Sequence, residues 1–78
     1  MATLTTQDDY LLILRDLVGF PVEADELDTP FDRLRGWDSV HLLKLVTAIE
    51  RETAVRLPVT RVLEARCLAE IFALAVTG

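Results

Sequence analysis

The sequence predicts an all-α fold, a four-helix bundle with three main helices, one short helix and a long loop between the first two helices. Three observations lead to this prediction. Apolar residues recur at helical spacing within residues 7–18, 40–53 and 66–76, and none of these segments contains proline or glycine. The chain has 78 residues, of which 51% are hydrophobic, enough for the core of one small domain. We therefore expect residues 1–78 to form a single domain.

The first helix is expected at residues 7–18. The segment from Thr5 to Asp8 has the form of a capping box, in which a hydroxyl is followed three residues later by an acid. Apolar side chains follow at helical spacing, namely Tyr10, Ile13, Leu14, Leu17 and Val18. Gly19 then indicates the end of the helix, and Pro21 prevents its continuation.

The long loop is expected at residues 20–37, where acids alternate with Pro21, Pro30 and Gly36. A loop of this length in a small domain is either functional or held by apolar anchors. The candidate anchors are Phe20, Val22, Leu27, Phe31 and Leu34. We expect residues 31–34 to form a single helical turn.

The net charge of −5 is spread unevenly along the chain. Residues 1–38 carry nine acids and three arginines, and the remainder carries five bases and four acids. An acidic first half disfavours nucleic acid as a partner and suits basic protein surfaces, although a solvated acidic loop explains residues 23–32 equally well. One cysteine excludes an internal disulfide and a zinc site built on paired cysteines. No signal peptide or membrane-spanning run is recognisable, so we expect a cytoplasmic protein.

Ser39 is the candidate functional residue. Gly36 permits an unusual turn, Asp38 is a favoured N-cap, and residues 40–53 continue as an uninterrupted helix, so Ser39 lies in the first turn. The unpaired N–H groups and the positive dipole end there favour a phosphate attached to the hydroxyl. His41 is not expected to face Ser39 and is interpreted as an exposed polar residue. Ser39 is therefore predicted to be modified rather than to act as a catalyst.

The helix behind Ser39 has two distinct faces. The stripe expected in the core is Leu42, Leu45, Val46 and Ile49. The opposite face carries Val40, Leu43, Lys44, Thr47 and Arg51. Its two aliphatic side chains predict a docking surface for a partner protein, although scattered exposed aliphatics are also normal. Trp37 is interpreted first as a half-buried loop anchor and second as a contributor to that docking surface.

The C-terminal segment is predicted to form an extended stretch and two further helices. Residues 55–58 are expected to be extended, because a residue before proline avoids helical angles. A short helix at 59–63 would cover the bundle with Val62 and Leu63, and a last helix follows at 66–76, with Cys67 as a small core residue. The predicted core contains Leu14, Leu17, Leu42, Leu45, Ile49, Leu68, Ile71 and Phe72.

The segment Gly36-Trp37-Asp38-Ser39-Val40 resembles the Asp-Ser-Leu modification motif of acyl carrier proteins and peptidyl carrier proteins, with Val40 in place of the usual leucine. The resemblance continues along residues 42–52 and into Leu57-Pro58, which is similar to the family's short loop after this helix. With the flanking helices it covers nearly the whole chain, whose length is near that of a free-standing carrier.

The resemblance implies a carrier protein that catalyses nothing itself and has no catalytic or metal-binding residues. A phosphopantetheinyl transferase, using Mg²⁺ and coenzyme A, would attach 4'-phosphopantetheine to Ser39, and Asp38 would contact that transferase besides capping the helix. The thiol of the arm would carry an acyl or aminoacyl group as a thioester. An acyl- or aminoacyl-loading enzyme and downstream synthase or tailoring enzymes would be further partners of a monomeric carrier, with no membrane involved.

The resemblance places Val40, Leu43 and Thr47 where family members present apolar contacts to partners. With Lys44 and Arg51 from the same face and with Trp37, they are the predicted partner-binding residues. Lys44 departs from the pattern, because fatty-acid carriers usually have an acid there and an acidic helix. Residues 40–53 have no net charge in this chain. This difference favours a carrier of polyketide or nonribosomal-peptide biosynthesis.

A second interpretation is a small helical adaptor module without a covalent arm, because Asp-Ser pairs are also ordinary helix caps. A DNA reader would need a basic recognition helix, which this chain lacks. An enzyme is disfavoured, since no group of acid, base and nucleophile is recognisable. Acceptance of the arm by Ser39 discriminates between carrier and adaptor.

Overall fold

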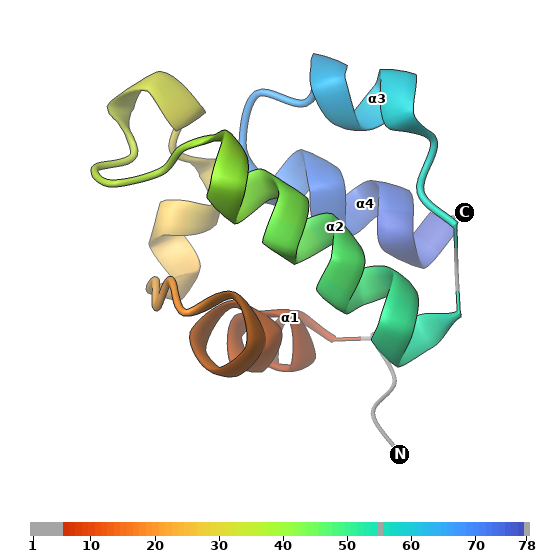
Figure 1. Ribbon diagram of the computed structural model, residues 1–78. Helices are drawn as coiled ribbons and strands as arrows, with labels where there is room; N and C mark the ends of the chain where they lie inside the picture. Colours follow the sequence, from red (N-terminus) through yellow and green to blue (C-terminus); the bar gives the residue numbers. More distant parts are fainter. Residues whose placement is uncertain (1–5, 55, 78) are drawn as a thin grey trace.

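The structure is a computed structural model that describes residues 6–54 and 56–77. Helices and turns follow one another as α1 (Gln7–Ile13), η1 (Leu14–Val18), η2 (Ala24–Asp28), η3 (Phe31–Arg33), α2 (Ser39–Thr53), α3 (Val59–Glu64) and α4 (Leu68–Thr77). Figure 1 shows α2 crossing the front of the molecule, with α1 below it, α3 above it and α4 behind it. The segments that the structure describes contain no strand, and the predicted all-α fold with one short helix is confirmed.

The first helix begins at Gln7 as predicted, but its capping box lies one residue later than expected. Thr6 is the N-cap: its hydroxyl accepts a hydrogen bond from the Asp9 amide (3.2 Å), and its own amide donates to the Asp9 carboxylate (3.3 Å). Thr5, the predicted cap, lies outside the described residues. The sequence contains two overlapping hydroxyl-to-acid pairs with the same spacing, so the pattern alone could not select between them.

The last turn of this helix is a π-helix, η1, and this corrects the predicted core. A π-turn is wound more loosely than an α-turn, so a residue three positions on does not return to the same face. Leu14 and Val18 are buried, whereas Leu17 is 50% exposed, and the prediction that Leu17 belongs to the core is wrong. Gly19 ends the helix as predicted, with a left-handed φ of 77°.

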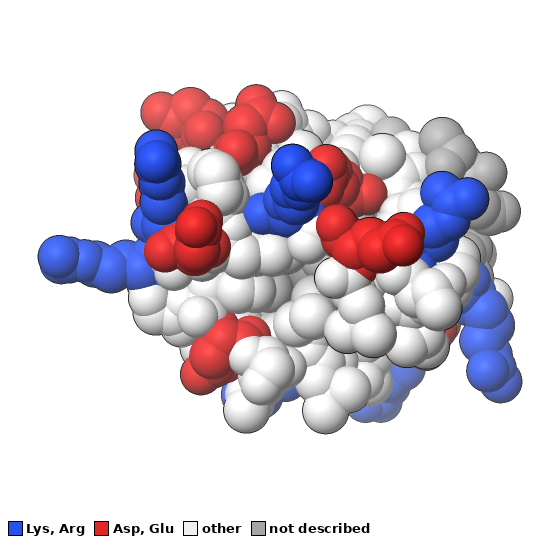
Figure 2. Space-filling view, turned by 90° about the horizontal axis from the view of Figure 1, so that it is seen from above, with Lys and Arg blue, Asp and Glu red and all other residues white. Residues whose placement is uncertain are grey.

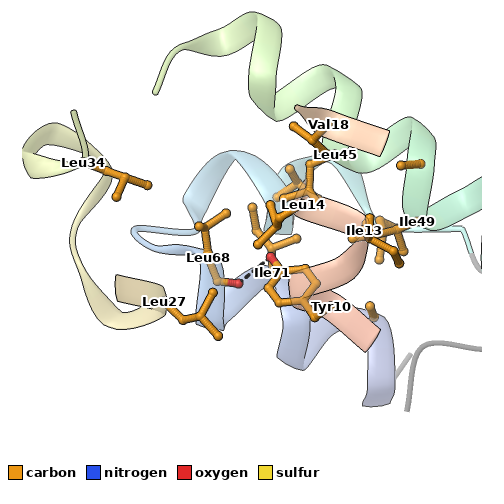
Figure 3. Close-up of a cluster of buried hydrophobic side chains, with 14 residues drawn as sticks. Tyr10, Ile13, Leu14, Val18, Leu27, Leu34, Leu45, Ile49, Leu68 and Ile71 are labelled. Carbon is orange, nitrogen blue, oxygen red and sulfur yellow. Dashed lines mark hydrogen bonds between the residues drawn. The ribbon is translucent and has the colours of Figure 1, made fainter. Parts of the chain in front are cut away.

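The core lies between α1, α2 and α4, as Figure 3 shows. Its fully buried large side chains are Tyr10, Leu14, Leu45, Ile49, Leu68 and Ile71. The Tyr10 hydroxyl donates to the carbonyl of Leu68 at 2.7 Å, which gives the one polar atom of this side chain a partner. Burial raises the pKa of the Tyr10 phenol above its ordinary value of 10.0, so the hydroxyl keeps the proton that it donates. The predicted core residues Leu42 and Phe72 lie at the margin of this cluster and are half-buried.

The long loop is held by the anchors that the sequence indicated. Leu27 and Leu34 are buried, and Phe20, Val22 and Phe31 pack against the core. The predicted single turn is η3, and the turn η2 was not anticipated. The Phe31 amide donates to the carbonyl of Arg66 at 2.8 Å, which ties the loop to the segment that precedes α4. The loop therefore has a defined path towards α2.

Two expectations about the C-terminal segment are wrong. Val62 is buried as expected, but Leu63 is 71% exposed and does not cover the bundle. Consecutive residues of a helix point about 100° apart, and α3 meets the bundle with the side that carries Val62, which leaves Leu63 in solvent. Cys67 is half-buried rather than a core residue. Residues 56–58 are outside regular structure, and Val55 lies outside the described residues.

The cap of α2 is the Asp38 side chain, as predicted. Asp38 has extended backbone angles, and its Oδ1 accepts a hydrogen bond from the His41 amide at 3.0 Å. That backbone hydrogen bond is the main reason why the pKa of Asp38 is lowered from its ordinary value of 3.8, and a second hydrogen bond from the His41 side chain acts in the same direction. The folded protein therefore favours the carboxylate form at the positive end of the α2 dipole.

Replacing Leu14 and Leu17 separately tests the π-turn. Leu14→Ala is expected to lower the free energy of unfolding by about 2–5 kcal/mol, because it leaves a cavity in the core. Leu17→Ala is expected to lower it by less than about 1 kcal/mol, because half of that side chain already meets water. Urea unfolding followed by circular dichroism measures both. Equal losses would show that η1 is not wound as described.

The Asp38 cap predicts that the stability difference between wild type and Asp38→Asn depends on pH. A depressed pKa stabilises the folded state above pH 3.8, and this contribution is lost as the pH falls through the lower pKa of the folded state. Asp38→Asn keeps a good N-cap without the charge, so its deficit relative to wild type should be present near neutral pH and should shrink below pH 3.8. Asp38→Ala should be destabilised at both pH values. Thermal unfolding at several pH values checks this, and a deficit of Asp38→Asn that is independent of pH would contradict it.

Candidate functional site

The site is formed where the long loop meets the start of α2. Gly36 has a left-handed φ of 83°, which side chains rarely adopt and which lets the loop reverse before Trp37. Asp38 is extended, and Ser39 is then the first residue of α2. Ser39 is exposed, so its hydroxyl can be reached from solvent. The first turn of the helix and the N-terminal end of its dipole lie beside this hydroxyl.

The Asp38 carboxylate is held by His41 from two directions. Besides the amide, the ring nitrogen Nδ1 of His41 lies 2.7 Å from the same oxygen, Oδ1. Because a carboxylate only accepts hydrogen bonds, Nδ1 is the donor of this pair. The Asp38 side chain nevertheless remains 59% exposed. It can therefore cap the helix and still meet a partner from solvent.

Three aromatic rings of the loop and the ring of His41 itself pack together. Trp37 stacks on Phe31, with ring centroids 5.1 Å apart and an interplanar angle of 6°, and meets the edge of Phe20 at 5.1 Å. The ring centroid of His41 lies 5.0 Å from that of Phe20 and 5.7 Å from that of Trp37. Trp37 is half-buried, in agreement with its role as a loop anchor.

His41 differs from its expectation as an exposed residue, because only 24% of its side chain is accessible. Its burial arises from Phe20 and Trp37, which precede it in the chain by 21 and 4 residues. No spacing within the helix could indicate such a contact. His41 is therefore a site residue that sequence reasoning missed.

The predicted outer face of α2 is on the surface. Val40 is 56% exposed and Leu43 is 68% exposed, and Lys44, Thr47 and Arg51 are exposed as well. Neither Lys44 nor Arg51 forms an ion pair with another described residue. On the inner side Leu45 and Ile49 are buried together with Ala48, which was not predicted. The predicted core stripe is thus confirmed for Leu45 and Ile49, whereas Leu42 and Val46 are half-buried.

An apolar groove runs between α2 and α3 and begins at Ser39. Its volume is about 430 Å³, and it is lined by Ser39, Val40, Leu42, Leu43, Val46, Glu50, Leu57, Val59, Val62 and Leu63. Seen from above, the middle of the face that carries α3 is uncharged and hollowed, and the charged side chains lie mostly around it (Figure 2). The exposed Val59 and Leu63 extend this apolar surface onto α3. The sequence signal that could have indicated Val59 and Leu63 is the presence of several aliphatic side chains in one short helix.

Other kinds of site have little support. Within residues 6–54 and 56–77 no group of three or more His, Cys, Asp or Glu side chains could hold a metal ion. In the same described segments, no helix has the length and apolar character needed to cross a bilayer. The chemistry of the site is thus that of one exposed hydroxyl at a helix start, beside a carboxylate and an apolar groove.

Comparison with protein families matches residues 11–75 to the phosphopantetheine attachment site. Neither the comparison with curated proteins nor the one with solved structures gave a significant match. The matched residues include the loop, the turn at Gly36 and all of α2 and α3. Because the match spans most of the chain, the protein belongs to the family of acyl and peptidyl carrier proteins, in which 4'-phosphopantetheine is attached covalently.

Proposed function

We propose that Ser39 is the residue that carries 4'-phosphopantetheine. The observation that supports this most directly is its position: an exposed hydroxyl on the first residue of a 15-residue helix, directly behind the Asp38 cap. The arm joins through a phosphodiester, whose negative charge is favoured by the free N–H groups and the dipole of the helix start. A phosphopantetheinyl transferase, with Mg²⁺ and coenzyme A, is the enzyme that attaches it, and Asp38 is its contact.

The chemistry of the carrier resides in the thiol at the end of the arm. A thiol has a pKa of about 8.5, so its thiolate leaves far more readily than an alkoxide and a thioester remains reactive towards the next acceptor. A flexible arm on a small domain also raises the effective concentration of the cargo at each docked enzyme. Loading and processing are performed by those enzymes, and the carrier is a monomer in the cytoplasm.

The cargo is an acyl or aminoacyl group of polyketide or nonribosomal-peptide biosynthesis. The charge of α2 supports this choice, because Lys44 and Arg51 are exposed without ion-pair partners among the described residues. Because residues 40–53 have no net charge, α2 lacks the acidic character that would attract a fatty-acid synthase enzyme with a basic docking patch.

Partner enzymes dock on the outer face of α2, around Leu43. Exposed aliphatics next to a reactive group form the apolar centre of such a surface, and Lys44, Thr47 and Arg51 form its polar margin. Val40 belongs to the same surface, and Trp37 contributes at its edge. The neighbouring groove between α2 and α3 continues the apolar centre as far as Leu63.

The attachment site is tested by intact mass after incubation with coenzyme A, Mg²⁺ and a broad-specificity phosphopantetheinyl transferase. Wild type should gain the mass of one arm, and Ser39→Ala should gain none. Thr60→Ala removes another exposed hydroxyl, on α3, and is the matched control, which should gain the arm. Arm uptake by Ser39→Ala would sink the proposal. No uptake by wild type, with a control carrier modified in parallel, would favour the adaptor function.

The docking surface is tested with Leu43→Asp. Because Leu43 is 68% exposed, the variant should keep its helical circular dichroism. Transfer of the arm from coenzyme A should slow by about tenfold in kcat/KM, corresponding to a loss of about 1.4 kcal/mol at the interface. Leu12→Asp changes another exposed leucine, on α1, and should transfer normally. A loss of helicity in Leu43→Asp would mean that the faces of α2 are assigned wrongly.

A further inference from the structure

We propose that His41 is a positioning residue for the modification of Ser39: its backbone amide and its ring together hold the Asp38 carboxylate, which caps the helix, in one orientation for the incoming transferase. This inference rests on the proposed function. It assigns a task to a side chain that lies two residues beyond Ser39 in sequence.

Both hydrogen bonds from His41 end on the same carboxylate oxygen. The amide donates to Oδ1 at 3.0 Å, and Nδ1 lies 2.7 Å from Oδ1. Rotation of a carboxylate about its last torsion is broad and nearly twofold when nothing holds it. Two donors from different directions on Oδ1 remove that freedom. The oxygen Oδ2 is not used by His41, and the side chain that carries it is 59% exposed.

The imidazole is in turn held by the loop. Its ring packs at 62° to Phe20 and at 26° to Trp37, and Trp37 is stacked on Phe31. With 24% of the side chain accessible, the ring has little space for another orientation. Asp38, by contrast, has most of its side chain in solvent. The fixed member of the pair is the imidazole, and the carboxylate takes its orientation from it.

The consequence is a carboxylate that is arranged before the transferase arrives. A side chain that is already ordered loses less freedom on binding, so the complex forms more readily. Loss of the Nδ1 donor should therefore weaken binding of the carrier to the transferase and leave the chemical step nearly unchanged. In kinetic terms the KM for the carrier should rise, with kcat little affected.

Two variants separate the donor from the ring. His41→Asn places an N–H donor near the position of Nδ1 and lacks the ring, whereas His41→Phe keeps a ring and lacks the donor. Both are measured as substrates of a phosphopantetheinyl transferase with coenzyme A, at a temperature where circular dichroism shows each protein folded. His41→Phe should raise the KM by about three- to tenfold, and His41→Asn should restore most of the wild-type value.

A double replacement shows whether His41 acts through Asp38. On the background of Asp38→Ala there is no carboxylate to orient, so His41→Phe should cause no further increase in KM. The inference is overturned if His41→Phe has the wild-type KM, if His41→Asn is the more impaired of the two, or if the effects of Asp38→Ala and His41→Phe add. If wild type gains no arm at all, the proposed function itself fails. If wild type gains the arm and one of the three outcomes above is observed, only the role of His41 is overturned.

Discussion

The site depends on the burial of one face of α2. Leu45 and Ile49 are completely buried, and burial of such a side chain stabilises the fold by roughly 1.5–3 kcal/mol. Small domains are stable by only about 5–15 kcal/mol in total, so no alternative rotation of α2 that exposes these residues can compete. The geometry of the helix then determines which residues lie on its opposite side. Val40 and Leu43 must face solvent, and Ser39 must lie at the exposed end.

The long loop adds a second constraint, which acts at the start of α2. Its buried leucines connect it to the core, and its aromatic side chains gather around Trp37 next to the cap. The turn at Gly36 and the extended Asp38 are therefore placed by contacts on both sides. Under the proposed function a modifying enzyme recognises the residues around Ser39, and a loop held in this way presents them in one arrangement. The length of the loop thus serves the site as well as the bundle.

The surface of the molecule divides its charges in a way that suits a carrier with several partners. The first half of the chain is acidic, whereas the outer face of α2 carries Lys44 and Arg51 beside exposed aliphatics. Apolar contacts supply most of the affinity at such an interface, and charges select the partner and accelerate its approach. Lys44 and Arg51 form no ion pair with another described residue, and Glu52 lines the same hollow as both of them, so this face presents charges of both signs to an enzyme that docks there.

Local patterns were sufficient for much of the fold. Residue types at helix ends were enough to predict the boundaries of α2, the Asp38 cap and the stop at Gly19. The spacing of apolar residues was enough to predict that Leu45 is buried and Leu43 exposed. The family was equally accessible, because its motif is a short continuous segment. The predictions that failed concern residues whose neighbours are distant in the chain or which lie in an irregularly wound helical turn. Leu17 was assigned to the core because no residue type indicates a π-turn. Leu63 was expected to cover the bundle because the sequence does not give the direction in which α3 meets it.

The sequence by itself determined which residues could form helices, where α2 begins and that Ser39 follows its cap, since these depend on interactions within a few residues. Only the tertiary structure decided that His41 lies among Phe20 and Trp37 and holds the Asp38 carboxylate, and that Val59 and Leu63 complete a groove which starts at Ser39. The contact of His41 with Phe20 and the groove between α2 and α3 join segments that are distant in the chain, and the Phe20 contact places the imidazole beside its near neighbours Trp37 and Asp38. Their partners are chosen by how the helices pack, which periodicity and local propensity do not encode.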